Sequence, residues 1–285
     1  MAYSTISSAG ADPPQDRPAR PVTVLDFARR KKAGEPIVMI TGYDALFASL
    51  VDAAGVDAIL VGDSVVSVLC GEKTTLSATV EQMIYHGRLV CRGAERALVI
   101  VDMPFMSYQV SPEQAVRNGG RILKETGAGA VKLEGGADFA PAVEALTRAG
   151  IPVMGHLGFT PQSVHALGGH RVQGRAKGAL EKLIRDARAL ESAGAFSVVL
   201  ELMPERIAEK VTHVLSIPTI GIGAGSHCSG QVLVLHDMLG MNESFEPRFL
   251  KRYAELGAEV RSAVSCYAEE VRTGAYPGPE HVHKS

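Results

Sequence analysis

The sequence predicts an α/β protein built as a single (β/α)8 barrel, a TIM barrel, with an N-terminal covering helix and extended C-terminal helices. Short apolar runs alternate with segments of helical periodicity along most of the chain, which is typical of parallel strands joined by helices. The 285 residues are enough for one such barrel, which uses about 250 residues. Glycine follows most of the helical segments, as it does at helix C-termini.

The expected elements follow one another in regular order. Thr23 caps a short helix that ends at Gly34 and covers the bottom of the barrel, and Ser111 followed by Pro112 is a strong helix start. The expected strands are 37–41, 58–62, 97–101, 130–134, 151–156, 196–201, 217–222 and 231–235. The expected helices are 24–32, 44–54, 79–92, 111–126, 139–149, 177–193 and 204–215, with a final helix or helix pair over 247–273.

An open, doubly wound sheet is the competing architecture. It needs a glycine-rich phosphate turn after the first strand, and Thr-Gly-Tyr-Asp at 41–44 is not one. The glycines of 221–225 resemble such a turn, but no long helix follows them. We therefore expect one catalytic barrel domain over 22–277, a mobile N-terminal tail over 1–21 and a flexible C-terminal tail over 278–285.

Composition narrows the classes of partner. The formal net charge is −2 and the one compact basic run is 29–32, so neither nucleic acid nor an anionic membrane surface is an expected partner. The four cysteines are far apart and form no C-x-x-C pair, which indicates reduced thiols in a cytoplasmic protein. No signal pattern opens the chain and no apolar run is long enough to cross a bilayer.

Four of the expected strands end on an acid. The run Ile-Leu-Val-Gly before Asp63 is followed by Ser64, and the third, fourth and sixth strands deliver Asp102, Glu134 and Glu201. In a (β/α)8 barrel the active site lies at the C-terminal ends of the strands. The recurrence therefore predicts that these acids meet in the mouth of the barrel.

Side chains alternate along a strand, so Lys132 and Glu134 share a face and both enter the mouth if one does. The same alternation is expected to pair Val61 with Asp63, Ile100 with Asp102, and Val199 with Glu201.

Four convergent acids repel one another unless a cation or protons intervene. Oxygen ligands supplied one per strand suit a hard divalent ion such as Mg²⁺, and Lys132 suits a substrate carboxylate or oxyanion. The alternative is that each acid is a strand-end residue facing solvent. His156, at the end of the fifth strand, could contact substrate or be a hydrogen-bonded core histidine, and Ser64 is placed for a substrate carboxylate.

The chain resembles the ketopantoate hydroxymethyltransferase family. The resemblance covers about 22–277 and its segments occur in family order. They are Thr-Gly-Tyr-Asp at 41–44, Leu-Val-Gly-Asp-Ser at 60–64, Val-Asp-Met-Pro-Phe at 101–105, Val-Lys-Leu-Glu-Gly-Gly at 131–136, Gly-His-Leu-Gly-Phe-Thr-Pro-Gln-Ser at 155–163, Leu-Glu at 200–201 and Ile-Gly-Ile-Gly-Ala-Gly at 220–225. The resemblance implies a (β/α)8 barrel that assembles into a homodecamer. It also implies a bound divalent metal, one Mg²⁺ per subunit, and 5,10-methylenetetrahydrofolate as co-substrate.

Carried over by motif, the resemblance implies roles for the strand-end residues. The metal-associated acids are Asp63, Asp102 and Glu134; the contacts to the 2-oxo acid are Asp63, Ser64, Asp102 and Lys132, with His156 as a further candidate; and Glu201 is the proton acceptor. The expected reaction moves a hydroxymethyl group onto 3-methyl-2-oxobutanoate through a Mg²⁺-stabilised enolate, giving 2-dehydropantoate for pantothenate and coenzyme A synthesis. The loop after the second strand departs from the family pattern at Glu72 and Ser77.

Three other functions fit parts of the pattern. A Mg²⁺-dependent C–C lyase or phosphoenolpyruvate mutase relative also uses enolates on this fold, although no reactive Cys or phosphate-binding group is evident in a lid loop. A class I aldolase would form a Schiff base on Lys132, but the adjacent acids favour a charged lysine. A non-catalytic binding barrel is the last alternative, and the presence of all four acids argues against it.

Overall fold

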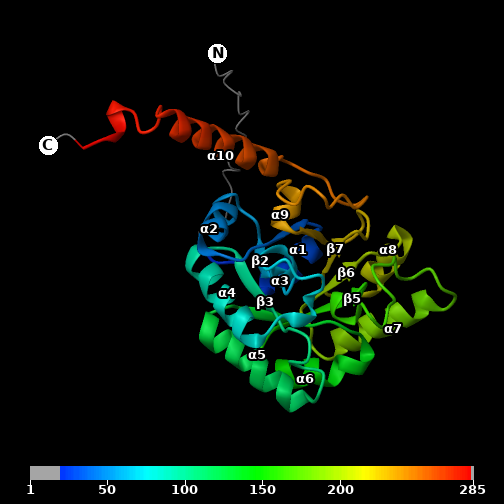
Figure 1. Cartoon of the computed structure of the whole chain (residues 1–285). Helices are drawn as coiled ribbons and strands as arrows, with labels where there is room; N and C mark the ends of the chain where they lie inside the picture. Colours follow the sequence, from blue (N-terminus) through cyan, green and yellow to red (C-terminus); the bar gives the residue numbers. More distant parts are fainter. Residues whose placement is uncertain (1–19, 284–285) are drawn as a thin grey trace.

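The computed structural model describes residues 20–283, in which eight parallel strands close into a barrel in sequence order. The expected (β/α)8 fold is therefore confirmed. Helices surround the barrel on all sides (Figure 1). The strands are β1 Ile37–Thr41, β2 Ala58–Val61, β3 Leu98–Asp102, β4 Ala130–Lys132, β5 Val153–Gly158, β6 Ser197–Glu201, β7 Thr219–Ile222 and β8 Gly230–Leu233.

The helices match the expected ones except near the C-terminus and in the loops. The longer helices are α1 Val24–Ala33, α2 Ala45–Ala53, α4 Val80–Gly93, α5 Pro112–Thr126, α6 Ala140–Arg148, α7 Ala179–Ser192, α8 Glu205–Val214 and α10 Leu256–Thr273. The final helix thus begins at Leu256 rather than at Pro247. Short helices that the sequence did not indicate are α3 Val65–Val68, α9 Leu235–Met238 and the 3₁₀ turns η1 Thr75–Ser77, η2 Ala137–Phe139, η3 Pro161–Ser163 and η4 Pro279–His281.

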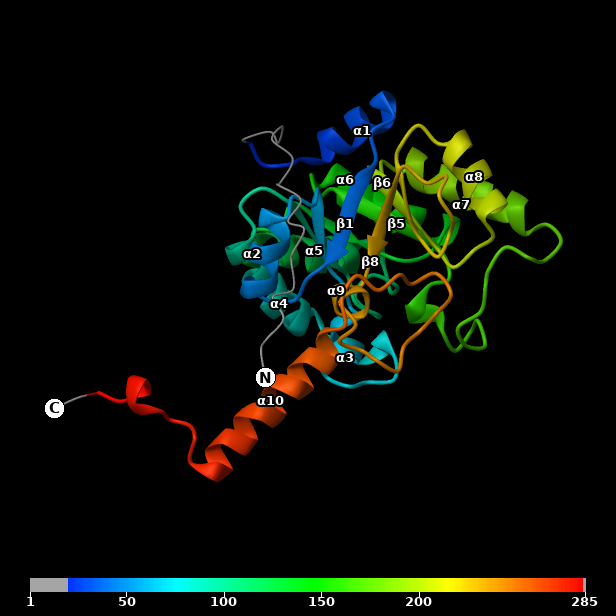
Figure 2. The same cartoon turned by 90° about the horizontal axis from the view of Figure 1, so that it is seen from above.

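Helix α1 covers the N-terminal end of the barrel, as expected. Thr23 and Asp26 form a capping box at its start, and Gly34 ends it with a φ of 71°, a left-handed conformation that favours glycine. Phe27 is buried and meets Phe196 edge to face. The bottom is therefore filled by apolar side chains, and α1 lies at the opposite end of the barrel from α3 and α9 (Figure 2).

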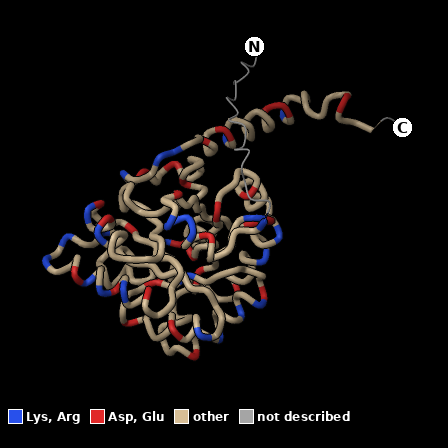
Figure 3. The backbone as a smooth tube through the Cα atoms, turned by 180° about the vertical axis from the view of Figure 1, so that it is seen from behind, with Lys and Arg blue, Asp and Glu red and all other residues tan. Residues whose placement is uncertain are grey.

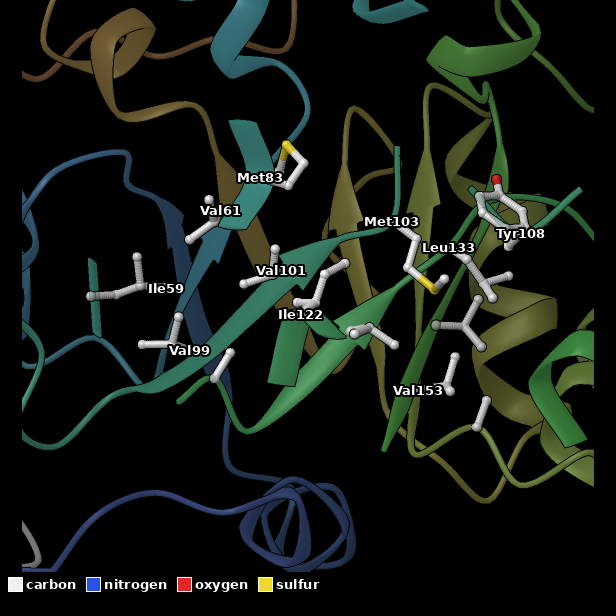
Figure 4. Packing of buried hydrophobic residues seen from close by; sticks show 14 of the residues in the cluster. Ile59, Val61, Met83, Val99, Val101, Met103, Tyr108, Ile122, Leu133 and Val153 are labelled. Atoms are coloured by element: carbon white, nitrogen blue, oxygen red, sulfur yellow. The ribbon is translucent and has the colours of Figure 1, made fainter. Parts of the chain in front are cut away.

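Two apolar layers form the core. The barrel interior includes Met39, Leu60, Ile100, Met154, Val199 and Ile220, whereas Ile59, Val61, Val99 and Val101 pack outward in the second layer. Figure 4 shows Val61 and Val101 in the same layer as Met83 of α4. The expected pairing of Val61 with Asp63 is therefore wrong, because β2 ends at Val61 and the chain turns at Gly62 before the alternation could continue.

Helix α10 extends away from the barrel (Figure 1) and has no buried residue. Residues 1–19 of the expected N-terminal tail and 284–285 of the C-terminal tail lie outside the described residues, so the domain boundaries stay predictions. Acidic and basic residues are interspersed along the chain (Figure 3). Within 20–283, no helix is both long and apolar enough to cross a membrane.

Candidate active site

The strand register brings Asp102 and Lys132 together. They are paired residues on β3 and β4, both point into the barrel, and Lys132 Nζ lies 2.8 Å from Asp102 Oδ1. Their side chains are 4% and 5% exposed. Because charges this deeply buried are costly without a partner, the ion pair stabilises both ionised forms.

Asp63 reaches the same place from the turn after β2. Its backbone N–H donates to Asp102 Oδ2 at 3.0 Å, so the two carboxyl groups are neighbours. A Cβ at Gly62 would lie 2.7 Å from Ser64 Oγ and 3.5 Å from Asp102 Oδ2, so a larger residue there would displace the Ser64 hydroxyl from its present position. Ser64 Oγ is 2.8 Å from the hydroxyl of the buried Tyr43.

Burial and neighbouring charges both shift the pKa values of Asp63, Asp102 and Lys132. Burial, reinforced by Asp102 and Glu134, raises the pKa of Asp63 well above its ordinary value. Burial also raises the pKa of Asp102, although the ammonium of Lys132 opposes this. Burial lowers the pKa of Lys132, but the surrounding carboxylates, Asp102 first, outweigh it and raise that pKa overall. Lys132 therefore stays charged, which argues against a Schiff-base role because imine formation needs the neutral amine.

His156 links the remaining two acids. Its Nδ1 lies 3.5 Å from Glu134 Oε1, and its Nε2 lies 3.1 Å from Glu201 Oε2. Lys132 Nζ is also near, 3.4 Å from His156 Nδ1. Burial and the charge of Lys132 lower the pKa of His156, but the adjacent carboxylates of Glu134 and Glu201 outweigh them and raise it to about 9. His156 is thus a buried group inside the charged cluster, not an isolated core histidine.

Glu201 differs from the other strand-end acids in its exposure. Its side chain is 21% exposed, whereas Asp63, Asp102 and Glu134 are buried. It is the last residue of β6 and is followed by Leu202, whose φ of 47° is left-handed. Of the four strand-end acids, Glu201 is therefore the one that solvent reaches.

Two further residues hold the site together, and the sequence did not single them out. Gln162, in η3, donates from Nε2 to Asp63 Oδ2 at 2.9 Å and from its backbone N–H to Glu134 Oε2 at 3.0 Å. Tyr108 donates from its hydroxyl to Gln162 Oε1 at 2.8 Å and accepts from the Glu134 N–H at 3.0 Å. Thr160-Pro161 before Gln162 is a helix-start signal directly after β5, which could have placed Gln162 at the mouth.

All seven sequence-predicted site residues therefore meet in the mouth of the barrel. They are Asp63, Ser64, Asp102, Lys132, Glu134, His156 and Glu201. The two loop positions that depart from the family pattern, Glu72 and Ser77, are exposed. Ser77 closes η1, which packs against η3 and hence near Gln162.

The donor set in the mouth fits a hard cation. Its acids offer oxygen ligands, two of which, Asp63 and Asp102, are buried side by side, and the cation beside them is the ammonium of Lys132 at Asp102 Oδ1. Three protein ligands do not converge, however: within 20–283, no group of three or more His, Cys, Asp or Glu side chains is arranged to hold a metal ion. A pair of carboxylates is still sufficient for Mg²⁺, which keeps several waters and takes other ligands from substrate.

Ionisable groups that are buried against one another, as these acids, Lys132 and His156 are, are typical of catalytic sites. Together with the position of the cluster at the C-terminal ends of the strands, they define a (β/α)8-barrel enzyme.

Comparison with known proteins gives the family. The family model for ketopantoate hydroxymethyltransferase matches residues 21–279. The 3-methyl-2-oxobutanoate hydroxymethyltransferase of Pelobacter propionicus is 55% identical over 91% of this chain and 96% of its own length. The enzyme of the same name from Clostridium beijerinckii is 52% identical over 92% and 95%. The chain belongs to the ketopantoate hydroxymethyltransferase family; it is an enzyme, a transferase that acts on small molecules.

Solved structures with low identity share the fold. A phosphonopyruvate hydrolase in complex with oxalate and Mg²⁺ has a TM-score of 0.62 at 12% identity, covering 92% of each chain. A 2,3-dimethylmalate lyase, described as a member of the PEP mutase/isocitrate lyase superfamily, has a TM-score of 0.57 at 17% identity, covering 91% of each. At this identity the likeness concerns the barrel alone, and the family match favours the transferase over the lyase and mutase alternatives.

Proposed function

We propose that the protein transfers a hydroxymethyl group from 5,10-methylenetetrahydrofolate to 3-methyl-2-oxobutanoate and releases 2-dehydropantoate, which feeds pantothenate and coenzyme A synthesis. Family membership supports the reaction. The roles of the individual residues are assigned from the difference in exposure among the charged side chains in the mouth. Asp102 and Lys132 form a buried ion pair next to Asp63, whereas Glu201 is the acid that solvent reaches.

The oxo acid is proposed to lie between the buried ion pair and Glu201. Its carboxylate and keto oxygen need donors, which Lys132 and the hydroxyl of Ser64 supply. Asp63 and Asp102 lie beside these donors. His156 is proposed to contact the oxo acid as well, because its ring lies against both Lys132 and Glu201. This placement leaves C3 of the oxo acid facing the partly exposed carboxylate.

Asp63 and Asp102 are the groups that would hold the divalent cation, one Mg²⁺ per subunit, with Glu134 close enough to Asp63 to raise its pKa. When bound, the cation supplies Lewis-acid stabilisation of negative charge on the keto oxygen. It also neutralises carboxylates that otherwise repel one another.

Glu201 is proposed as the general base. Its carboxylate takes the proton from C3, and the electron pair of the broken C–H bond moves into the keto group to give an enolate. The methylene bridge of the folate opens to an iminium, and water adds to its carbon and breaks both C–N bonds, which releases tetrahydrofolate and a formaldehyde equivalent. The enolate carbon then forms a C–C bond to that carbon, and its oxygen takes a proton to become the hydroxyl group of the product. Lys132 offsets negative charge on the oxo acid throughout.

Product analysis with a labelled donor tests this reaction. The purified protein, Mg²⁺, 3-methyl-2-oxobutanoate and folate labelled at the methylene carbon should give 2-dehydropantoate labelled in its hydroxymethyl carbon. Omission of either substrate is the control. Absence of labelled product, together with cleavage of a lyase or mutase substrate, would favour the enolate-forming lyase instead.

We propose further that the protein self-associates, to a decamer as the family resemblance implies, and works in the cytoplasm. All four cysteines are free thiols, as expected in a reducing compartment. Helix α10 exposes Val260, Val264, Tyr267 and Val271, which lie four, three and four residues apart on one face. A second copy is the occupant expected for such an apolar stripe. Light scattering should show an oligomer that the double variant Val264→Glu/Tyr267→Glu reduces in size, and a monomeric wild-type protein would contradict this.

A further inference from the structure

Gln162 makes an unusual number of hydrogen bonds for one buried side chain. Its Nε2 donates to Asp63 Oδ2 at 2.9 Å and to the Met103 carbonyl at 3.0 Å. Its Oε1 accepts from the Tyr108 hydroxyl at 2.8 Å and from Gln109 Nε2 at 3.1 Å. An amide has two donor hydrogens on nitrogen and two lone pairs on oxygen, so all of its capacity is used and its orientation is fixed.

The backbone of the same residue binds a second acid. The Gln162 N–H donates to Glu134 Oε2 at 3.0 Å, while the Tyr108 hydroxyl accepts from the Glu134 N–H at 3.0 Å. Gln162 therefore occupies one carboxylate oxygen of Asp63 and one of Glu134. These contacts join positions that are 99 and 28 residues apart in the sequence.

Fixing one oxygen of a carboxylate decides which way the other faces. Asp63 lies in the turn after β2, which ends at Val61, so regular strand pairing does not orient its side chain. Glu134 lies just beyond the end of β4 at Lys132, although the N–H groups of its neighbours Leu133 and Gly135 still donate to carbonyls of β5. Gln162, on a turn next to β5, supplies the restraint from outside both strands. A fully satisfied amide is suited to this because it stays neutral and adds no charge to a crowded acidic site.

We propose that Gln162 is a positioning residue for the cation site: it fixes the orientation in which Asp63 would bind the divalent ion, it holds the neighbouring Glu134 in place, and Tyr108 holds Gln162. This inference rests on the cation site of the proposed function and adds a residue to which no role has been assigned. Partners that orient metal-binding carboxylates typically change metal affinity by about 10- to 100-fold when removed.

Direct metal binding, measured without either substrate, tests the proposal. Mn²⁺ is the probe, because its free and bound forms are distinguished by electron paramagnetic resonance. Gln162→Met keeps the length of the side chain and removes the amide, and it should weaken Mn²⁺ binding by about 10- to 100-fold. Gln173→Met is the matched control, because the Gln173 Nε2 donates to the carbonyl of Arg171 in an exposed part of the same loop; its Mn²⁺ affinity should equal that of the wild type.

A different result is expected if Gln162 only stabilises the fold. In that case Gln162→Met would lower the melting temperature of the metal-free protein and leave Mn²⁺ affinity unchanged, and this outcome would overturn the proposal. If Gln162→Met does not fold, Tyr108→Phe decides, since it removes one hydroxyl from Gln162 Oε1 and leaves the amide in place. It should weaken Mn²⁺ binding several-fold, and unchanged affinity would overturn the proposal equally.

The proposed cation site is checked separately with Asp102→Asn, which lacks a carboxylate but keeps Gln162. If Asp102→Asn binds Mn²⁺ as the wild type does, the cation site itself is wrongly assigned. If Asp102→Asn loses Mn²⁺ while Gln162→Met binds it normally, the cation site stands and the positioning role of Gln162 fails.

Discussion

Replacement of Lys132 by methionine should destabilise the fold strongly. Lys132 Nζ lies 2.8 Å from Asp102 Oδ1 in a pair whose side chains are 5% and 4% exposed. At an effective dielectric constant of about 20, that contact is worth about 6 kcal/mol before the cost of desolvation. Methionine fills the same volume but leaves Asp102 buried with Asp63 and Glu134 and no compensating cation. Breaking such a pair costs about 3–5 kcal/mol, which is the expected loss at pH 7 without Mg²⁺.

The loss should depend on pH in a defined direction. Burial raises the folded-state pKa of Asp63 and Asp102, so ionising them opposes folding once the pH passes their unfolded value of about 4. Removing Lys132 raises these pKa values further. The difference in unfolding free energy between wild type and Lys132→Met should therefore shrink as the pH falls from 7 toward 4.

Chemical denaturation monitored by circular dichroism provides the measurement, on metal-free protein at both pH values. Lys124→Met is the matched control, because Lys124 is an exposed lysine near the end of α5 and such changes usually stay within about 0.5 kcal/mol. A loss for Lys132→Met that is no larger than that of the control, or that grows at low pH, would mean that the buried pair of Lys132 and Asp102 does not stabilise the fold.

Three more outcomes follow from the structure. Gly62→Ala places a methyl group against Ser64 Oγ; because the hydroxyl can rotate away, the fold should lose only about 1–3 kcal/mol, whereas steady-state kinetics should show a raised KM for the oxo acid. At the other end of the barrel, the Arg20 guanidinium lowers the pKa of Asp26 well below its ordinary value, so the stability that Asp26 contributes is fully present above pH about 4 and is lost progressively as the pH falls below that; the deficit of Asp26→Asn in denaturation should thus be largest at pH 6 and should decrease steadily below pH about 4. Treatment with EDTA should abolish transferase activity and added Mg²⁺ should restore it. Full activity after chelation would mean that the reaction does not require a divalent cation.

The elements with strong local signals were predictable. Ser111-Pro112 predicted the start of α5, and the Ser111 side chain does accept from the Gln114 N–H. Likewise, alternation along β3 and β6 placed Asp102 and Glu201 in the mouth correctly. Helix α3, Val65–Val68, was missed because four residues give only about one helical turn, too little for a periodic signal.

The missed parts of the site depend on long-range contacts. Val61 and Asp63 were paired by alternation, but the chain leaves the strand at Gly62, between them, so the alternation does not reach Asp63; a glycine there was a boundary signal. Gln162 reaches Asp63 across 99 residues of sequence, and nothing near either residue indicates the contact. The acids could be predicted because each ends an apolar run, whereas the amide and hydroxyl groups that orient them stand in loops without such a pattern.

Proton exchange at C3 of 3-methyl-2-oxobutanoate shows whether Glu201 is the base in a site built by Asp63, Asp102 and Lys132. In deuterated buffer with Mg²⁺ and no folate, nuclear magnetic resonance should show the wild-type enzyme exchanging the C3 proton. Glu201→Gln, which keeps the shape and contacts of the side chain, should lower this rate by at least about 100-fold while the oxo acid still binds. Exchange at the wild-type rate in Glu201→Gln would mean that a group other than Glu201 removes the proton.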